Sequence, residues 1–171
     1  SEMCIRDSSV GDYFDYFSAV ICYNGEGTWE WEVDGFNKVV WISSFATWWG
    51  PCQSEAPAVE SIYQQYIDNP NVEIVSAGMD WGQPYSCSSW AETFGQTFPI
   101  LDDNNGSSIY GLFGVGYVPH NAVIGGDGQV IFSESGFNQN TMLAMIEEGL
   151  ENLILDVDED GVLDSDDNCI D

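Results

Sequence analysis

The spacing of apolar residues in the first half of the chain predicts a strand, a helix and a second strand. Residues 38–44 are apolar on both faces, as in a sheet that helices cover, and residues 72–79 form the next apolar run. Between them, apolar residues recur at helical spacing over residues 58–67, and the sequence Asp68-Asn69-Pro70 ends the helix. This order predicts a right-handed parallel crossover.

The other predicted elements are shorter. Residues 88–94 and 108–113 predict short helices, and residues 122–124 and 130–132 predict a hairpin around a glycine-rich turn. Residues 28–33 alternate between polar and apolar, which predicts a half-buried strand that ends at the turn Asp34-Gly35. A closing helix is predicted over residues 141–153, with Thr141 as its N-cap. Its buried stripe consists of Met142, Met145, Ile146, Leu150 and Leu153.

One cysteine follows the first apolar strand at a predicted helix start. Residues 45–57, FATWWGPCQSEAP, predict a tight turn and then a helix N-terminus that contains Cys52. Free backbone N–H groups and the helix dipole favour a thiolate over a thiol at such a position. We therefore expect the pKa of Cys52 to lie below the usual value of about 8.5.

This segment resembles the active-site segment of thioredoxin-like proteins, particularly the secreted TlpA/ResA type and related redoxins, whose pattern is Phe-x-Ala-Thr-Trp-Cys-x-Pro-Cys-x-x-Glu-x-Pro. Cys52, Glu55 and Pro57 match the second cysteine, the acidic residue and the helix proline. Trp49 replaces the first, nucleophilic cysteine. Dithiol exchange needs one thiolate to attack and a second to resolve the mixed disulfide, so that cycle cannot run through this motif.

The resemblance implies an α/β, thioredoxin-like fold over residues 9–154. A central mixed β-sheet would be flanked by helices, with a β extension at the N-terminus. Residues 116–124, GYVPHNAVI, resemble the family's proline before a central antiparallel strand, which implies a cis Val118–Pro119 bond that faces the cysteine motif. Pro119 is therefore a candidate site residue.

Two further candidates would lie near that motif. His120 is the only histidine, and a pKa near 6.5 would suit it to take a proton from Cys52; the alternative is a histidine that only packs or forms hydrogen bonds. Cys87 lies in a loop at the carboxyl end of a predicted strand, where it is either a second reactive thiol or a structural cysteine.

Four cysteines outside the N-terminal segment, at positions 22, 52, 87 and 169, allow three full pairings, among which the sequence does not choose. Our preferred structural pair is Cys22 with Cys87. Residues 1–8 are excluded from the fold argument, because residues 2–8 resemble the translation of a sequencing adapter. We expect the natural N-terminus to be truncated, and no signal peptide is visible.

The charge of the chain limits its partners. Two cationic residues stand against 29 acidic ones, which gives a formal net charge of -27. Such a chain repels phosphate backbones and anionic membranes, so we exclude nucleic-acid binding and expect calcium, a salty medium or cationic partners. No run of 18 apolar residues occurs, so no membrane span is predicted, and no organic cofactor is expected. The acidity of the chain and the calcium motif in its tail favour an oxidising extracellular or periplasmic location, where disulfides persist.

The acidic tail, residues 155–171, has the spacing of a calcium-binding loop. In such a loop, carboxylates at positions 1, 3, 5, 9 and 12 supply oxygen ligands to Ca²⁺, and a glycine at position 6 permits the sharp turn. The tail has these residues at this spacing. The tail resembles a partial thrombospondin type 3 repeat, including its Asp-Asn-Cys ending. The candidate ligands are the side chains of Asp156, Asp158, Asp160, Asp164 and Asp167 and the carbonyl of Val162. The alternative is a disordered acidic tail.

Three functions stay open at this point. The first is a secreted protein of thiol-disulfide oxidoreductase ancestry, impaired in dithiol exchange, in which Cys52 meets protein thiols or disulfides and Glu55 and His120 tune it. The second is a non-catalytic extracellular binding or structural module with a protein partner at the surface of Trp48 and Trp49. The third is a peroxiredoxin-like peroxidase with Cys52 as the peroxidatic thiol, although Arg6 is the only arginine.

Overall fold

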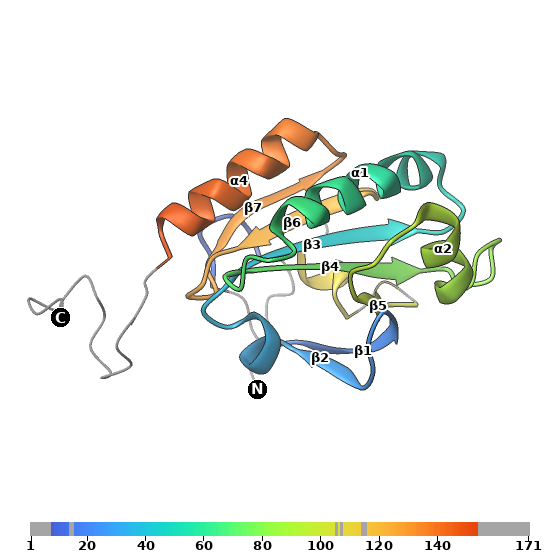
Figure 1. Cartoon of the computed structure of the whole chain (residues 1–171), viewed down its shortest axis with the longest axis horizontal. Helices are drawn as coiled ribbons and strands as arrows, with labels where there is room; N and C mark the ends of the chain where they lie inside the picture. Colours follow the sequence, from blue (N-terminus) through green and yellow to red (C-terminus); the bar gives the residue numbers. More distant parts are fainter. Residues whose placement is uncertain (1–7, 14–15, 105, 107, 114–115, 154–171) are drawn as a thin grey trace, which may run out of the picture.

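A computed structural model of the chain describes residues 8–13, 16–104, 106, 108–113 and 116–153 (Figure 1). They form a seven-stranded sheet with the order β2-β1-β5-β4-β3-β6-β7. The strands are β1 (Ser18–Tyr23), β2 (Thr28–Glu30), β3 (Val39–Ala46), β4 (Val72–Met79), β5 (Ile100–Asp102), β6 (His120–Ile124) and β7 (Val130–Ser135). The helices are η1 (Trp31–Gly35), α1 (Gly50–Tyr66), α2 (Cys87–Phe94), α3 (Tyr110–Phe113) and α4 (Gln139–Glu151).

The sheet is mixed, with a parallel centre and antiparallel sides. Strand β3 pairs in parallel with β4, and β4 pairs in parallel with β5. Strands β6 and β7 continue the sheet beside β3 in antiparallel order, and β1 and β2 continue it beside β5. The predicted strand, helix and parallel strand are therefore confirmed, and so is the predicted hairpin near residue 127.

Helices cover both faces of this sheet. Helices α1 and α4 lie together on one face (Figure 1), where Trp41 and Phe45 of β3 pack in one core cluster with residues of α1, α2 and α4. On the other face a second cluster joins Ile42 to aromatic residues near β1, β2 and α3. Because side chains alternate along a strand, neighbouring residues of β3 face different clusters.

Helix α1 joins two predicted segments, the helix N-terminus that contains Cys52 and the amphipathic residues 58–67. It starts at Gly50, directly after the turn, and continues through Pro57. A proline inside a helix removes one backbone hydrogen bond, so the continuity of the helix across Pro57 needs an explanation. The helix persists because Cys52, Ala56 and Val59 lie on one buried face and hold its first turns against the core.

Two other boundaries differ from the prediction. Helix α4 is capped by Asn138, whose side chain accepts a hydrogen bond from the Thr141 N–H at 3.0 Å, so Thr141 is not the N-cap. Strand β2 ends at Glu30 and the chain then turns in η1, because the Asp34 carboxylate accepts a hydrogen bond from the Glu30 N–H at 2.8 Å. Gly35 permits this turn, since a Cβ there would lie 2.6 Å from the Trp31 ring.

The preferred cysteine pair is confirmed. Cys22 of β1 and Cys87 at the start of α2 form a disulfide across 65 residues of sequence. The acidic tail and its six candidate calcium ligands lie outside the described residues, as do residues 1–7. Within the described ranges, no group of three His, Cys, Asp or Glu side chains is placed to hold a metal ion. None of the helices in those ranges is both long and apolar enough to cross a membrane.

Candidate functional site

The turn between β3 and α1 is held by backbone carbonyls and one carboxylate of the loop that follows β4. The buried Thr47 hydroxyl lies 2.7 Å from the Asp80 carbonyl and 3.0 Å from the Gln83 carbonyl. The Trp48 indole N–H donates to the Asp80 carboxylate at 2.7 Å. Trp48 and Trp49 are 51% and 39% exposed and meet edge to face. The turn therefore presents two indoles at the surface, and Asp80 holds that of Trp48 in place.

Cys52 points away from this surface into the core. Its side chain is 2% exposed and belongs to the cluster that contains Phe45 and Trp90. Burial raises the pKa of the Cys52 thiol to about 12; a hydrogen bond with the Ala46 backbone opposes this rise, and the nearby Glu55 adds to it. The expected low pKa is therefore wrong, because the cost of burying a thiolate exceeds the stabilisation by the helix N-terminus.

Glu55 lies one turn further along α1 and is also buried, at 5% exposure. Its Oε1 accepts a hydrogen bond from the Ser43 hydroxyl at 3.0 Å, whereas its Oε2 has no hydrogen-bond partner among the described residues. Burial raises the pKa of Glu55 to about 7, and the Ser43 hydroxyl and the Asn121 amide partly oppose that rise. The Asn121 amide donates its own hydrogen bond to the Gly136 carbonyl at 2.8 Å.

Pro119 lies across a groove from Trp49. The predicted cis Val118–Pro119 bond is confirmed, and a second cis bond, Gln83–Pro84, was not predicted. The groove has a volume of about 360 Å³, and we call it the Trp49 groove. It is lined by Trp49, Pro51, Ser54, Glu55, Tyr117, Pro119, Gly136 and Phe137. The structure thus brings together Trp49, Glu55 and Pro119, with Cys52 buried beneath them.

His120 does not share this site. It pairs in register with Ser44, whereas Asn121 pairs with Ser43, the partner of Glu55. Directly paired residues of neighbouring strands project from the same face, so His120 lies on the opposite face of the sheet from Glu55 and Cys52. Its ring nitrogens contact the hydroxyls of Ser133 at 3.0 Å and Ser135 at 3.3 Å, and burial lowers its pKa. His120 is therefore a packed, hydrogen-bonded histidine, which was one of the two predicted alternatives. The other alternative, a base that takes a proton from Cys52, is wrong.

Cys87 is not a second reactive thiol, because its sulfur is bonded to Cys22. Cys52 is consequently the free cysteine of the described residues. Of the two alternatives for Cys87, the structural cysteine is therefore confirmed and the second reactive thiol is wrong.

Sequence reasoning missed the groups that surround Glu55. The Ser43 hydroxyl bonds to Glu55, Ser43 and Asn121 oppose the rise of its pKa, and Tyr117 and Phe137 line the groove beside it. A polar residue inside the apolar strand β3 was the available signal for Ser43, because buried hydroxyls are paired. No comparable signal marked Tyr117 or Phe137, which approach only through the fold.

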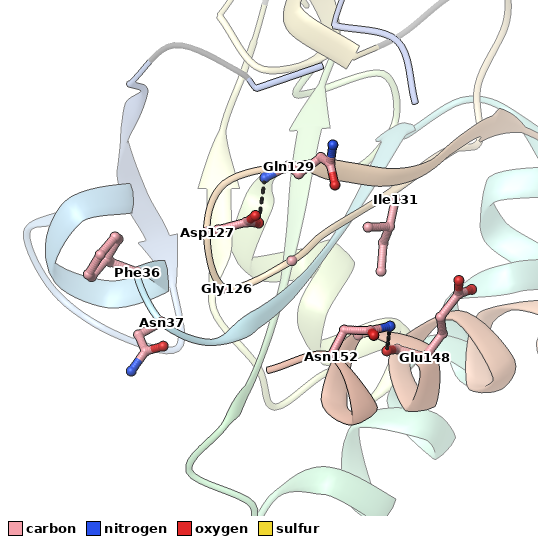
Figure 2. Close-up of a pocket in the computed structure, with 10 residues that line it drawn as sticks. Phe36, Asn37, Gly126, Asp127, Gln129, Ile131, Glu148 and Asn152 are labelled. Carbon is pink, nitrogen blue, oxygen red and sulfur yellow. Dashed lines mark hydrogen bonds between the residues drawn. The ribbon is translucent and has the colours of Figure 1, made fainter. Parts of the chain in front are cut away.

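A larger pocket, of about 420 Å³, lies at the other end of β3 (Figure 2). Its lining includes Asn37, before β3, and Asn152, at the end of α4. Eight strand residues separate it from the Trp49 turn, which is roughly 25 Å. Two of its polar side chains are already bonded: Asp127 accepts from the Gln129 N–H, and Asn152 donates to the Glu148 carbonyl.

Comparison with known proteins identifies a matching family and individual relatives of this chain. The sequence profile described as the AhpC/TSA family matches residues 17–133. The thiol-disulfide oxidoreductase ResA of Bacillus thuringiensis is 31% identical over 94 residues, which are 55% of this chain and 53% of that protein. The thioredoxin-like protein YneN of Bacillus subtilis is 34% identical over 73 residues, 43% of each chain. The chain thus spans about half the length of these relatives.

Solved structures show the same fold. A thiol:disulfide interchange protein of the thioredoxin family from Chlorobium tepidum has a TM-score of 0.67 at 18% identity, over 84% of this chain and 99% of that one. A secreted disulfide oxidoreductase of Mycobacterium tuberculosis has a TM-score of 0.61 at 16% identity, over 77% and 95%. The predicted thioredoxin-like α/β fold is therefore confirmed.

Proposed function

The chain belongs to the AhpC/TSA family, and on this premise we propose that it is a member of the thiol-disulfide oxidoreductase superfamily that does not perform dithiol exchange. We propose that its Trp49 groove instead binds a protein partner. The observation that supports this proposal most directly is the state of the motif, in which Trp49 replaces the attacking cysteine and Cys52 is buried with a pKa of about 12.

The high pKa of Cys52 argues against a reaction in which this thiol acts alone as the nucleophile. The thiolate is the nucleophilic form, and a pKa of about 12 leaves roughly one thiolate in a hundred thousand thiols at pH 7. The same value argues against the peroxiredoxin-like alternative, which also needs a cationic group beside the peroxide. Lys38 is the cationic side chain of the described residues, and it lies before the start of β3, at the far end of that strand from Cys52.

The surface around Trp49 has the features of a binding site. Trp48, Trp49 and Tyr117 are exposed aromatic residues that lie beside a groove, and aromatic side chains are enriched at protein interfaces. The indole of Trp48 is bonded to Asp80, so its position is set before a partner arrives. A fixed aromatic surface loses little conformational entropy on binding.

A matched pair of variants tests the loss of dithiol exchange. The change Trp49→Cys restores two cysteines at the family spacing, and Trp48→Cys adds a cysteine one position away. In an insulin-reduction assay we expect no catalysis by the natural chain or by Trp48→Cys, and measurable catalysis by Trp49→Cys, because only that variant has an attacking and a resolving thiol. Catalysis by the natural chain at the rate of Trp49→Cys would refute the proposal.

We further propose that the tail binds calcium through Asp156, Asp158, Asp160, Asp164, Asp167 and the Val162 carbonyl. The support is the spacing of these residues in the sequence. Calorimetric titration of the full chain with Ca²⁺ should give saturable heat with a dissociation constant on the order of 0.1 to 1 mM, as in extracellular modules. An Asp158→Asn and Asp160→Asn double variant should lose that heat, and no saturable heat in the natural chain at millimolar Ca²⁺ would remove this proposal.

We also propose an extracellular or periplasmic location. The disulfide between Cys22 and Cys87 supports it, because disulfides persist in oxidising compartments. The similarity in fold to a secreted disulfide oxidoreductase of Mycobacterium tuberculosis agrees with this location.

A further inference from the structure

Most of the lining of the Trp49 groove consists of aromatic and proline rings. The aromatic rings are those of Trp49, Tyr117 and Phe137, and the prolines are Pro51 and Pro119. Trp49 and Tyr117 are 39% and 64% exposed, so their rings are accessible to a ligand. Such a surface recognises a ligand mainly by packing against apolar groups, and a few polar groups set its orientation.

The backbone of the groove offers few hydrogen-bond donors to an incoming chain. Three of the lining N–H groups are already donated within the protein, from Trp49 to the Ala46 carbonyl at 3.2 Å, from Gly136 to the Pro119 carbonyl at 2.7 Å and from Tyr117 to the Ser135 hydroxyl at 3.2 Å. The two prolines of the lining have no N–H. A peptide that binds as an added β-strand depends on main-chain hydrogen bonds, which this lining supplies poorly.

The side chains of the groove do offer donors. Among the described residues, neither the indole N–H of Trp49 nor the hydroxyl of Tyr117 has a hydrogen-bond partner. An indole N–H donates and cannot accept. The groove therefore suits a ligand that is rich in apolar rings and carbonyl oxygens and poor in N–H groups.

We propose that the Trp49 groove binds a proline-rich segment of a partner protein in the polyproline II conformation, with basic residues beside the prolines. Proline supplies a rigid apolar ring and an exposed carbonyl, and it has no N–H that the groove would have to satisfy. Grooves lined by aromatic side chains bind such segments in other proteins. This inference rests on the proposed function, because it names the chemistry of the partner at the same groove.

Both surfaces would meet in shapes that they already have. The polyproline II helix is formed before binding, so a proline-rich segment loses little conformational entropy. The Trp49 ring meets the Trp48 ring edge to face, with 5.5 Å between centroids, and the Asp80 carboxylate accepts a hydrogen bond from the Trp48 indole at 2.7 Å. The aromatic side of the groove is therefore braced by the loop after β4.

Charge complementarity favours basic residues beside the prolines. Asp80 lies behind Trp48 on one side of the groove, and the exposed Glu134 of β7 precedes the lining residue Gly136 by two positions. Lys38, the lysine of the described residues, lies before β3, at the far end of that strand. The net charge of -27 also raises the association rate of positively charged segments and repels acidic ones.

Three blocked heptapeptides separate the contributions of conformation and charge. The first, KPPAPPK, has prolines between basic ends, the second, KTVATVK, has the same charges around a strand-forming core, and the third, EPPAPPE, has prolines between acidic ends. Binding to the full chain is measured by NMR titration at about pH 7.5 in about 150 mM salt. We expect KPPAPPK to bind about tenfold more tightly than either of the others, because KTVATVK loses more entropy and leaves N–H groups unpaired, and EPPAPPE is repelled.

Matched variants locate the binding site. Trp49→Ala and Tyr117→Ala each remove one exposed ring of the groove, and each should weaken the binding of KPPAPPK about tenfold. Phe36→Ala removes an exposed ring outside the groove and should leave the affinity unchanged. Equal weakening by Phe36→Ala and by the two groove variants would overturn the inference, because exposed rings in general would then explain the binding.

The remaining outcomes separate the inference from the proposed function. Binding of KTVATVK as tight as that of KPPAPPK, and weakened by Trp49→Ala, would overturn the polyproline assignment and leave the groove as a protein-binding site. Binding of EPPAPPE as tight as that of KPPAPPK would overturn the requirement for basic residues. No binding of any of the three peptides would refute both the inference and the proposed binding role of the groove, whereas the loss of dithiol exchange is tested separately by insulin reduction.

Discussion

At position 49 an indole occupies the turn at which the related motif has a thiol, and this one residue changes what the neighbouring residues can do. Without a nearby attacking sulfur, Cys52 is a buried, apolar thiol that packs against the core. Among the described residues, Glu55 is then the buried titratable group that has an oxygen without a hydrogen-bond partner. The Glu55 carboxyl therefore titrates much closer to neutral pH than the Cys52 thiol.

The raised pKa of Glu55 predicts a pH dependence of stability. Between its ordinary value of 4.5 and about 7, the folded protein binds a proton at Glu55 that the unfolded chain does not, so the free energy of unfolding should fall as pH rises through this range. Relative to Glu55→Gln, the loss should reach roughly 3 kcal/mol and stay constant above about pH 7.5.

Urea denaturation of the natural chain and of Glu55→Gln, at several pH values between about 4.5 and 8, measures this difference. The other acidic residues are the same in both proteins, so their contributions cancel. A difference between the two proteins that does not change with pH would contradict the raised pKa.

At the scale of elements, the turn and first helix depend on segments far away in sequence. Thr47 and Trp48 are held by the loop after β4, and Glu55 is held by β3. The β1–β2 extension is joined covalently to α2 through Cys22 and Cys87. This disulfide connects the edge of the sheet to the helix whose Trp90 packs beside Cys52.

Removal of that disulfide should lower the stability substantially. A crosslink across 65 residues restricts the unfolded chain, and the chain-entropy relation gives a contribution of about 4 kcal/mol. A double Cys22→Ala and Cys87→Ala variant should therefore show a lower urea midpoint than the natural chain.

Dithiothreitol provides the control for this prediction. It should lower the midpoint of the natural chain and leave that of the double variant unchanged. An equal effect on both proteins would mean that a different disulfide determines the stability.

At the scale of the whole molecule, the excess of acidic residues opposes compaction. A net charge of -27 creates repulsion that salt screens, so we expect the melting temperature at about pH 7.5 to rise between roughly 10 mM and 500 mM sodium chloride. The measurement is calorimetry with a chelator present, so that calcium does not contribute.

The matched control is the same salt series near the sequence pI of about 4.1, where the net charge is small. The rise in melting temperature should be much weaker there. A melting temperature that falls with salt at pH 7.5 would show that attractive ion pairs, rather than repulsion, dominate the electrostatics of this chain.

The fold was largely accessible to prediction because its signals are local. The apolar run at residues 72–79 matches β4, and the residues 45–57 and 116–124 were sufficient to predict a thioredoxin-like sheet with a cis Pro119. The continuity of α1 through Pro57 was less accessible, because the proline weakens the local helix signal and packing against the sheet compensates for it. Boundaries of this kind depend on contacts that a linear pattern does not contain.

The sequence by itself determined that Trp49 replaces the attacking cysteine, that β3, α1 and β4 form a parallel crossover, and that the chain is strongly acidic. Only the tertiary structure decided the burial of Cys52, the face on which His120 lies and the burial of the Glu55 carboxyl. The physical reason is that residue type and spacing are properties of the chain. The burial of an ionisable group and its hydrogen-bond partners are set by elements that meet only after folding.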